Sequence, residues 1–372
     1  MLNRTLNYYD LLFIAIGNII GGGVFSLMGR GIFHGKGYTW ILLLLSGFAM
    51  LYMSRAYVDI QDKIVGNESE FILAEEVGGK KFATLHTISS ILSSTLTGSV
   101  ITLAFADHIN KVLGTDIPKK VIASITIIIV GIINSIGIRE STTVINSMTI
   151  IELLTLVILA FMVPSYINMK ELSVKPMLKE SMLVPLIMIF AFTGAEALPK
   201  LAGETKNNKD IPKAITTSIS ITTVLYALVS IVMISVLGTK TITNTPMVDV
   251  EDKIFNNGKV IGTIALFSIF NTVLMSNISA SRTLYGYGVR NKIDHVTKTN
   301  TKQTPYIAII CCTALSLLLT HMGSMERLAI LSNVSIMFTM IMINMNAYKD
   351  KKRVRNIISI VMASIFALYG LF

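Results

Sequence analysis

The residues of this chain that could do chemistry gather in one apolar run, residues 181–203, which has the length of a membrane helix. Thr193 and Gly194 fall near its middle, and Glu196 and Lys200 follow shortly after. A membrane helix of about 20 residues is normally apolar throughout, so this pattern predicts a helix interrupted at Gly194. Non-helical backbone at membrane depth must be buried in protein or line a cavity. Such an interruption is typical of the solute-binding site of a secondary transporter.

A second interruption is predicted in the first apolar run, where four glycines occur within seven positions: Gly17, Gly21, Gly22 and Gly23. Each glycine lowers helix stability by about 1 kcal/mol relative to alanine. The alternative is close helix packing, because small residues four apart, such as Gly17 and Gly21, let two helices touch. Interruptions in the first and sixth runs, five helices apart, instead indicate two inverted repeats with a binding site between them.

Two carboxylates lie within predicted membrane helices, where such groups are costly and usually mark an ion or proton path. Glu196 is the first candidate for gating or ion coupling, and the alternative is an i,i+4 pair with Lys200. Glu152 lies about ten residues into its apolar run, too deep for a short side chain to reach water. It is a candidate acceptor for H⁺ or Na⁺, and the alternative is a structural pair with Arg282.

Ser279 and Ser281 of the eighth run could supply oxygen ligands to a coupling ion, although serines in a helix are often merely tolerated. We favour H⁺ as the coupling ion because two buried carboxylates suit proton binding, and Na⁺ remains the alternative. No cofactor is expected. No metal site is predicted either, because no ligand spacing joins the histidines at positions 34, 86, 108, 295 and 321.

The composition is that of an integral membrane protein. Of the 372 residues, 52% are hydrophobic and 15% are charged, whereas about a quarter are charged in soluble proteins. The net charge of +10 is spread between apolar runs, which favours anchoring in a lipid bilayer over nucleic-acid binding. Enzymatic chemistry is not predicted, because the chain has no GxSxG, HExxH or P-loop pattern.

Apolar runs of spanning length predict eleven helices within a single multi-pass domain, residues 1–372. The connecting segments on one side carry 19 positive charges against 12 on the other, which predicts a cytoplasmic N-terminus. The predicted helices occupy about 11–31, 38–56, 83–107, 120–138, 142–163, 181–203, 213–238, 259–286, 305–321, 327–347 and 356–372.

Several motifs resemble those of the amino acid–polyamine–organocation permeases, over about residues 10–347. These are IGNIIGGGVFSLMG at 16–29, INSIGIRESTTVINSMTIIELLTL at 133–156, FAFTGAEALPKLAGETKNNKDIPKAI at 190–215, and SNISASRTLYGYGVR at 276–290 followed by TPYIA at 304–308.

The resemblance implies an all-α, LeuT-like fold in which five plus five helices form two inverted repeats, with helices 1 and 6 broken. The repeats would span about 11–163 and 181–347, with an extra helix at about 356–372. It also implies a secondary active transporter that moves an amino acid, polyamine or related amine by alternating access.

The resemblance further implies how an amino acid would be held. In family members that carry amino acids, backbone N–H groups of the first motif bind the substrate carboxylate, and these fall here on Gly22 and Gly23. Carbonyl groups that map to Ile19, Phe190 and Thr193 would hold the ammonium. Exposed N–H groups at a half-helix start attract an anion, and free carbonyls attract a cation, so elementary electrostatics agrees.

Gly21 and Gly194 belong to the same two breaks, where a Cβ would keep a ligand away from the backbone. We also expect a phenylalanine beside the second break, Phe190 or Phe192, to cover the substrate and act with Glu196 as a gate. Most family members have twelve helices, whereas eleven are predicted here, so a transport-incompetent sensor or scaffold is the alternative function. An ion channel is disfavoured because no predicted helix has a polar stripe along its length.

Overall fold

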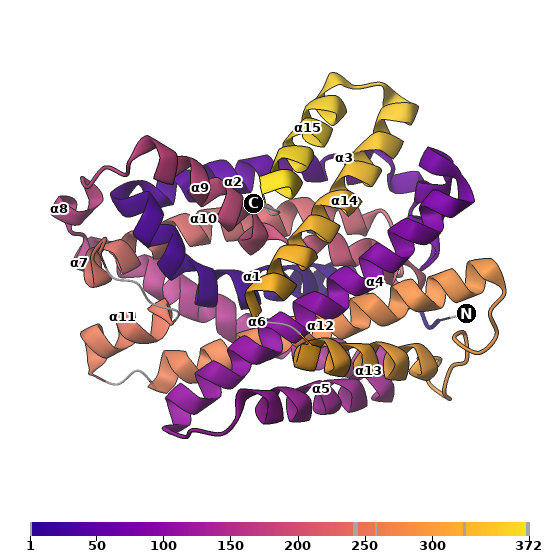
Figure 1. Cartoon of the computed structure of the whole chain (residues 1–372), viewed down its shortest axis with the longest axis horizontal. Coiled ribbons are helices and arrows are strands. Elements are labelled where there is room, and N and C mark those ends of the chain that lie inside the picture. The colour runs from indigo at the N-terminus through magenta and orange to yellow at the C-terminus, as the bar shows by residue number, and fades with distance from the viewer. Residues whose placement is uncertain (1, 241–244, 257–258, 323–324, 370–372) are drawn as a thin grey trace.

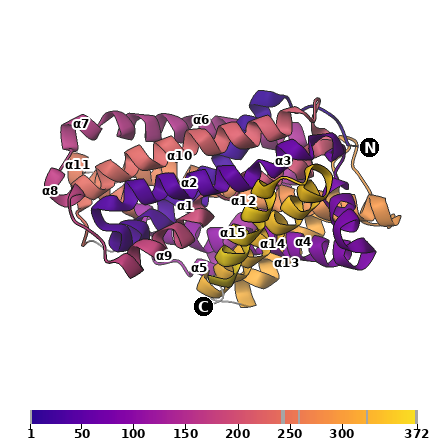
Figure 2. The same cartoon turned by 90° about the horizontal axis from the view of Figure 1, so that it is seen from above.

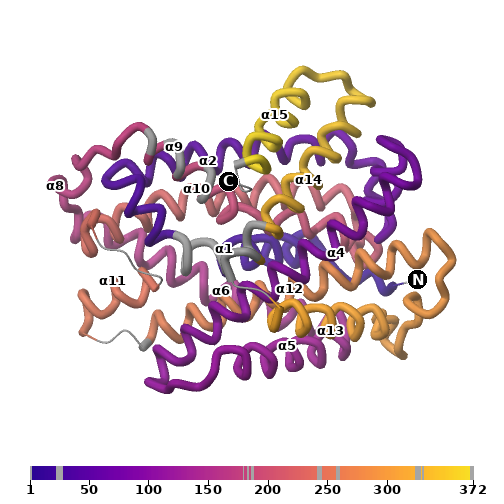
Figure 3. Tube along the Cα trace, in the orientation of Figure 1, coloured from indigo at the N-terminus to yellow at the C-terminus, as the bar shows by residue number. Residues whose placement is uncertain are grey.

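The structure is a computed structural model of the whole chain, and it describes residues 2–240, 245–256, 259–322 and 325–369. Within these ranges, some residues are described only by their place in a helix: 22–27, 179, 182–183, 186–187, 259, 325–327, 329–330 and 369. Figure 3 draws the residues of uncertain placement in grey.

The described residues form helices, and their one β-type contact is an isolated parallel bridge between Leu6 and Thr205. Short helical segments join the longer helices: η1 (Lys36–Tyr38), α3 (Ala56–Asp59), η2 (Gln61–Lys63), α7 (Val163–Tyr166), α8 (Met169–Leu172) and α11 (Pro246–Phe255). The longer helices are α1 (Tyr8–Gly35), α2 (Thr39–Ser54), α4 (Ser69–Leu113), α5 (Lys119–Ile136), α6 (Ile138–Phe161), α10 (Asp210–Leu237), α12 (Lys259–Asn291), α13 (Tyr306–Met322), α14 (Met325–Lys351) and α15 (Val354–Tyr369).

Each of the eleven predicted runs contains helix, but fewer are long and apolar enough to be assigned as spans. Six described stretches meet that criterion, and three shorter apolar helices, Tyr8–Gly21, Tyr306–Met322 and Val354–Leu368, accompany them. The six are Met28–Asp59, Ser69–Leu113, Lys119–Ile136, Ile138–Phe161, Asp210–Leu237 and Val260–Asn291. The chain is therefore a multi-pass, all-helical membrane protein.

Helix α1 lies at the centre of the bundle, where it packs against α10, α12 and α6 (Figures 1 and 2). The α14–α15 hairpin, yellow in both views, packs against α4 and α2 on one side of the bundle. A capping box starts α1: the Asn7 side chain accepts from the backbone of Tyr9 and Asp10, and the Asp10 carboxylate accepts from Asn7 N. The Asp10 carboxylate also accepts hydrogen bonds from the side chains of Arg139 and Asn146, which connects α1 to α6.

The predicted interruption of the sixth run is confirmed. Helix α9 (Leu178–Met188) continues into a 3₁₀ turn, η3 (Ile189–Phe192), and a second 3₁₀ segment, η4 (Ala195–Glu204), follows the break. Between them Thr193 is extended, and Gly194 has a φ of 127°, which only glycine adopts without strain.

The two described glycines of the first-run motif serve helix packing. A Cβ on Gly17 would lie 2.1 Å from Thr149 Oγ1, and one on Gly21 would lie 1.8 Å from Thr272 Oγ1. These contacts support the close-packing alternative for Gly17 and Gly21. Helix α1 is assigned as one element from Tyr8 to Gly35. The predicted carboxylate-binding glycines, Gly22 and Gly23, lie outside the described residues.

Helix α4 differs from the sequence prediction at its start. It begins at Ser69 rather than near residue 83, and it bends at Gly79, whose φ is 77°. The segment before that bend brings Glu70 into the buried interior, where it is 4% exposed.

Replacing Gly21 by alanine should destabilise the protein by about 1–3 kcal/mol, because the added methyl group would collide with Thr272 and with the Ser268 backbone carbonyl. Gly31→Ala is the matched control in the same helix, since its methyl group would meet only the flexible end of Met188. Thermal melting of both variants in detergent checks this. Equal melting temperatures would contradict the packing role of Gly21.

Candidate functional site

A cavity of about 50 Å³ lies beside the break at Gly194. Its walls come from the centre of α1, from α4, from the broken segment, and from α12 and α14. It is lined by Asn18, Ile19, Ser90, Ser93, Ser94, Thr97, Ile101, Phe190, Thr193, Gly194, Glu196, Ala197, Lys200, Thr272, Ser276, Ser279, Ile336 and Thr339.

The break is held to α1 through Asn18. The Asn18 side-chain amide donates to Gly194 O at 2.8 Å, and a Cβ on Gly194 would lie 2.9 Å from the Asn18 carbonyl oxygen. On the other side of the same residue, Gly194 N donates to Glu196 Oε2 at 2.6 Å. Both polar groups of the unwound backbone at Gly194 are thus satisfied by side chains. The sequence analysis did not single out Asn18, although it stands inside the first glycine motif.

Four of the predicted substrate-binding residues line the cavity: Ile19, Phe190, Thr193 and Gly194. Two of their carbonyl groups already accept hydrogen bonds. Ile19 O accepts from the Tyr226 hydroxyl at 2.9 Å, and Phe190 O accepts from the Thr193 hydroxyl at 2.7 Å. Gly21 lies against α12, as described above.

The two phenylalanines beside the break occupy different places. Phe190 lines the cavity and is partly exposed. Phe192 is fully buried, and its ring centroid lies 5.2 Å from that of Tyr226. Of these two phenylalanines, Phe190 is the one at the cavity wall.

Glu196 and Lys200 both line the cavity, but they are not arranged as an α-helical i,i+4 pair. Segment η4 is a 3₁₀ helix, in which residues three apart, rather than four, are aligned. The Glu196 carboxylate caps the break at Gly194, and Lys200 Nζ donates to Ser94 Oγ on α4 at 3.3 Å. The predicted gating residue Glu196 is thus part of the break itself.

Lys200 belongs to a buried group that the sequence analysis missed. It lies within electrostatic range of Glu196 and of Glu70, whose carboxylate accepts from Ser90 at 3.4 Å. Among the described residues, Glu70 Oε1 and the Tyr57 hydroxyl are buried without a hydrogen-bond partner. The segment that carries Glu70 had no helical pattern in the sequence, so nothing placed Glu70 beside the cavity.

The alternative pairing of Glu152 with Arg282 is wrong. Glu152 is fully buried, and its Oε1 accepts from the Asn271 amide at 3.4 Å. That amide also donates to Thr149 at 2.9 Å. Glu152 Oε2 has no hydrogen-bond partner in the described part of the chain. A fully buried carboxylate therefore stands beside α1 without a salt-bridge partner among the described residues.

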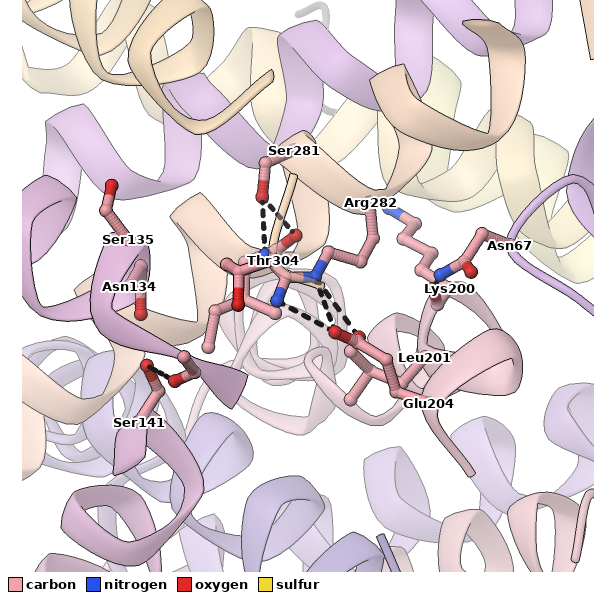
Figure 4. Close-up of polar contacts among 12 residues, drawn as sticks. Asn67, Asn134, Ser135, Ser141, Lys200, Leu201, Glu204, Ser281, Arg282 and Thr304 are labelled. Atoms are coloured by element: carbon pink, nitrogen blue, oxygen red, sulfur yellow. Dashed lines mark hydrogen bonds and ion pairs between the residues drawn. The ribbon is translucent and has the colours of Figure 1, made fainter. Parts of the chain in front are cut away.

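Arg282 instead pairs with Glu204 at the end of η4 (Figure 4). Its Nε lies 3.2 and 3.1 Å from the two carboxylate oxygens, and a terminal nitrogen lies 2.9 Å from one of them. Both side chains are 1% exposed or less. The other terminal nitrogen of Arg282 donates to Ser281 Oγ at 3.2 Å. This pair fastens η4 to α12.

The residues predicted to couple an ion do not form one site. Ser279 lines the cavity and lies 3.2 Å from Ser94 Oγ, whereas Ser281 belongs to the Arg282 pair. The Glu152 carboxylate contacts Asn271, eight positions before Ser279, which is about 12 Å along the axis of α12. The point on α12 that Glu152 of α6 contacts is thus separated from the two serines along that helix.

Comparisons with known proteins identify relatives of this chain. The family profile described as "Amino acid permease" matches residues 6–372. A branched-chain amino acid permease of Bacillus subtilis is 24% identical and aligns with 95% of this chain and 82% of its own length. The methylthioribose transporter of the same organism is 24% identical over 62% of this chain and 55% of its own length. Cationic amino acid transporter 5 of Arabidopsis thaliana is 25% identical over 62% of this chain and 44% of its own length.

Removing one member of the buried Glu204–Arg282 pair should cost about 3–5 kcal/mol, because the other charge is left without its partner. Glu204→Leu and Arg282→Met should each show this loss, whereas the double variant should recover most of it. The exposed Glu140–Lys302 pair is the control, and Glu140→Gln should change stability by about 1 kcal/mol or less. Unfolding measurements on all four variants test this. Additive losses in the double variant would show that the pair acts otherwise.

Proposed function

The chain belongs to the amino acid permease family, and from that premise we propose that it is a secondary active transporter for amino acids or related amines, working by alternating access. It is a membrane transporter and not an enzyme, as its family membership establishes. The observation that carries the finer proposal is the cavity at the break of the sixth run. Its walls come from the two segments that the sequence marks as interrupted and from neighbouring helices.

The proposed architecture is a LeuT-like fold of eleven membrane helices. Repeat one would span about residues 11–163 and repeat two about 181–347, with an extra helix at about 356–372 and a cytoplasmic N-terminus. The contact between α1 and the broken segment supports this, because each is the first element of its repeat. In inverted-repeat transporters, substrate binds between two such elements near the middle of the bilayer.

Within this proposal, an amino acid lies in the cavity with its ammonium near Thr193 and its carboxylate towards Gly22 and Gly23. The unwound backbone at Thr193 and Gly194 supports the first placement, because it lies at the cavity wall. Phe190 covers the solute, and Glu196, which caps the break, responds to its movement. These roles rest on position and on the chemistry of the exposed groups.

We assign coupling to Glu152, with H⁺ as the favoured ion. Burial favours the neutral form of a carboxyl group, so a single buried carboxylate is well suited to load and release a proton. Glu152 lies within electrostatic range of Tyr226, whose hydroxyl bonds the cavity-lining Ile19 carbonyl. The charge state of Glu152 can therefore influence the cavity through the Tyr226 hydroxyl and its hydrogen bond to Ile19 O. Sodium is the alternative, because Ser268 lies beside the Glu152 carboxylate and Asn271 Oδ1 is a further buried oxygen without a partner among the described residues.

The coupling proposal predicts that Glu152→Gln, which imitates the protonated carboxyl group, keeps substrate exchange but loses uphill uptake driven by a pH gradient. The measurement is uptake of labelled amino acids into proteoliposomes, with and without the gradient. Accumulation by the variant should fall to the equilibrium ratio, while Glu140→Gln, an exposed control, should behave as the unmodified protein.

Three outcomes of the same assay would count against parts of this proposal. Full uphill uptake by Glu152→Gln would make that residue structural. A strict requirement for sodium at fixed pH, without response to a proton gradient, would replace H⁺ by Na⁺. Saturable binding without flux would favour the sensor or scaffold alternative over a carrier.

A further inference from the structure

The cavity walls away from the break are rich in hydroxyl groups, which come from three different helices. Ser94 lies on α4, Ser276 and Ser279 on α12, and Thr339 on α14. Binding sites for small molecules are usually lined mainly by apolar side chains with few polar groups. The hydroxyl-rich wall therefore indicates which kind of solute the cavity would bind.

Two of these hydroxyl groups already donate their one hydrogen bond to a backbone carbonyl of their own helix. Ser276 Oγ donates to Thr272 O at 2.8 Å, and Thr339 Oγ1 donates to Ser335 O at 3.3 Å. A hydroxyl group has one donor and two acceptor lone pairs, so only acceptors remain on these side chains. The wall formed by Ser276 and Thr339 thus favours a solute that brings its own hydrogen-bond donor.

An aliphatic side chain placed against this wall would displace water from the hydroxyl acceptors and leave them unpaired. A site built for hydrogen bonds rejects analogues that lack the matching group far more strongly than an apolar site rejects an added hydroxyl. Branched-chain side chains therefore fit this cavity poorly.

A cationic side chain is disfavoured for a separate reason. Lys200 lines the cavity while only 6% exposed, so its ammonium would face a second positive charge in a place largely shielded from water. The nearby Glu196 carboxylate already accepts from Gly194 N, and Glu70 faces Lys200 from the segment before the bend in α4. Lys200 thus acts against solutes with a basic side chain.

We propose, building on the transport function proposed above, that the cavity selects small amino acids with a hydroxyl side chain, serine and threonine, over branched-chain and cationic amino acids. This preference differs from the substrates for which several of the similar proteins are named. The proposal follows from the hydroxyl acceptors of Ser276 and Thr339 and from the buried ammonium of Lys200.

The test begins with uptake of labelled serine into proteoliposomes that contain the full chain, in competition with unlabelled amino acids. Serine and threonine should inhibit at concentrations about tenfold lower than leucine or arginine, the factor that one hydrogen bond of typical strength provides. Stronger inhibition by leucine or arginine would overturn the proposed selectivity and leave transport itself supported. Absence of flux for every amino acid would instead overturn the transport proposal, and this inference with it.

Variants then test the hydroxyl wall. Ser276→Ala and Thr339→Val should each reduce the preference for serine over alanine by about fivefold to tenfold, a ratio that is insensitive to how much protein is folded. Ser220→Ala is the matched control, because its hydroxyl makes the same bond to a carbonyl four residues earlier but lies on the exposed face of α10. An unchanged serine-to-alanine ratio in both cavity variants would overturn the role of the wall.

A third variant tests the excluded charge. Lys200→Met should allow arginine and lysine to inhibit serine uptake more strongly than they inhibit the unmodified protein. The readout is the ratio of arginine to leucine inhibition, which a general loss of folded protein would not move. An unchanged ratio would show that Lys200 does not exclude basic side chains.

Discussion

The site depends on how a short unwound backbone is satisfied inside the protein. An unpaired peptide group at membrane depth costs several kcal/mol, so a helix can be interrupted there only if other groups replace the lost hydrogen bonds. At Gly194 the carbonyl accepts from the Asn18 amide and from Ala197 N, and the N–H donates to the Glu196 carboxylate. The Thr193 hydroxyl likewise bonds Phe190 O. These bonds position α1, the break and a carboxylate around the same cavity.

The buried charges differ in kind, and the difference separates structural from functional groups. Arg282 and Glu204 satisfy one another through several hydrogen bonds and leave little capacity for another partner. In the described part of the chain, Glu152 contacts the neutral side chains of Asn271 and Ser268, and Lys200 donates to the hydroxyl group of Ser94. A buried charged group that is fully hydrogen-bonded to an opposite charge stabilises the fold. A buried charged group that lacks some of its hydrogen-bond partners can still interact with a proton, an ion or a solute.

The sequence predicted the break because glycine and a carboxylate are both out of place in an apolar run, and the structure has the interruption at that point. It also predicted where helices lie, since long apolar runs leave few alternatives. The partner of Arg282 could not be predicted, because Glu204 is 78 positions away and composition alone offered Glu152 equally well. The roles of Gly17 and Gly21 were ambiguous for a related reason: small residues four apart fit both close packing and ligand approach. Glu70 and the contacts of Lys200 were not predicted, because a bend at Gly79 and a 3₁₀ segment determine where these side chains lie.

Helix α12 links the three polar regions of the protein. Asn271 contacts Glu152, Ser276 and Ser279 line the cavity, and Arg282 holds η4. These positions follow one another at helical spacing within about 16 Å of a single helix. Because α12 carries all of them on one element, a shift of α12 against α1 would alter the surroundings of Glu152 and the width of the cavity together. The Arg282 pair would carry the same shift to η4, so the geometry connects the charge state of one buried carboxylate to the helix break that borders the solute.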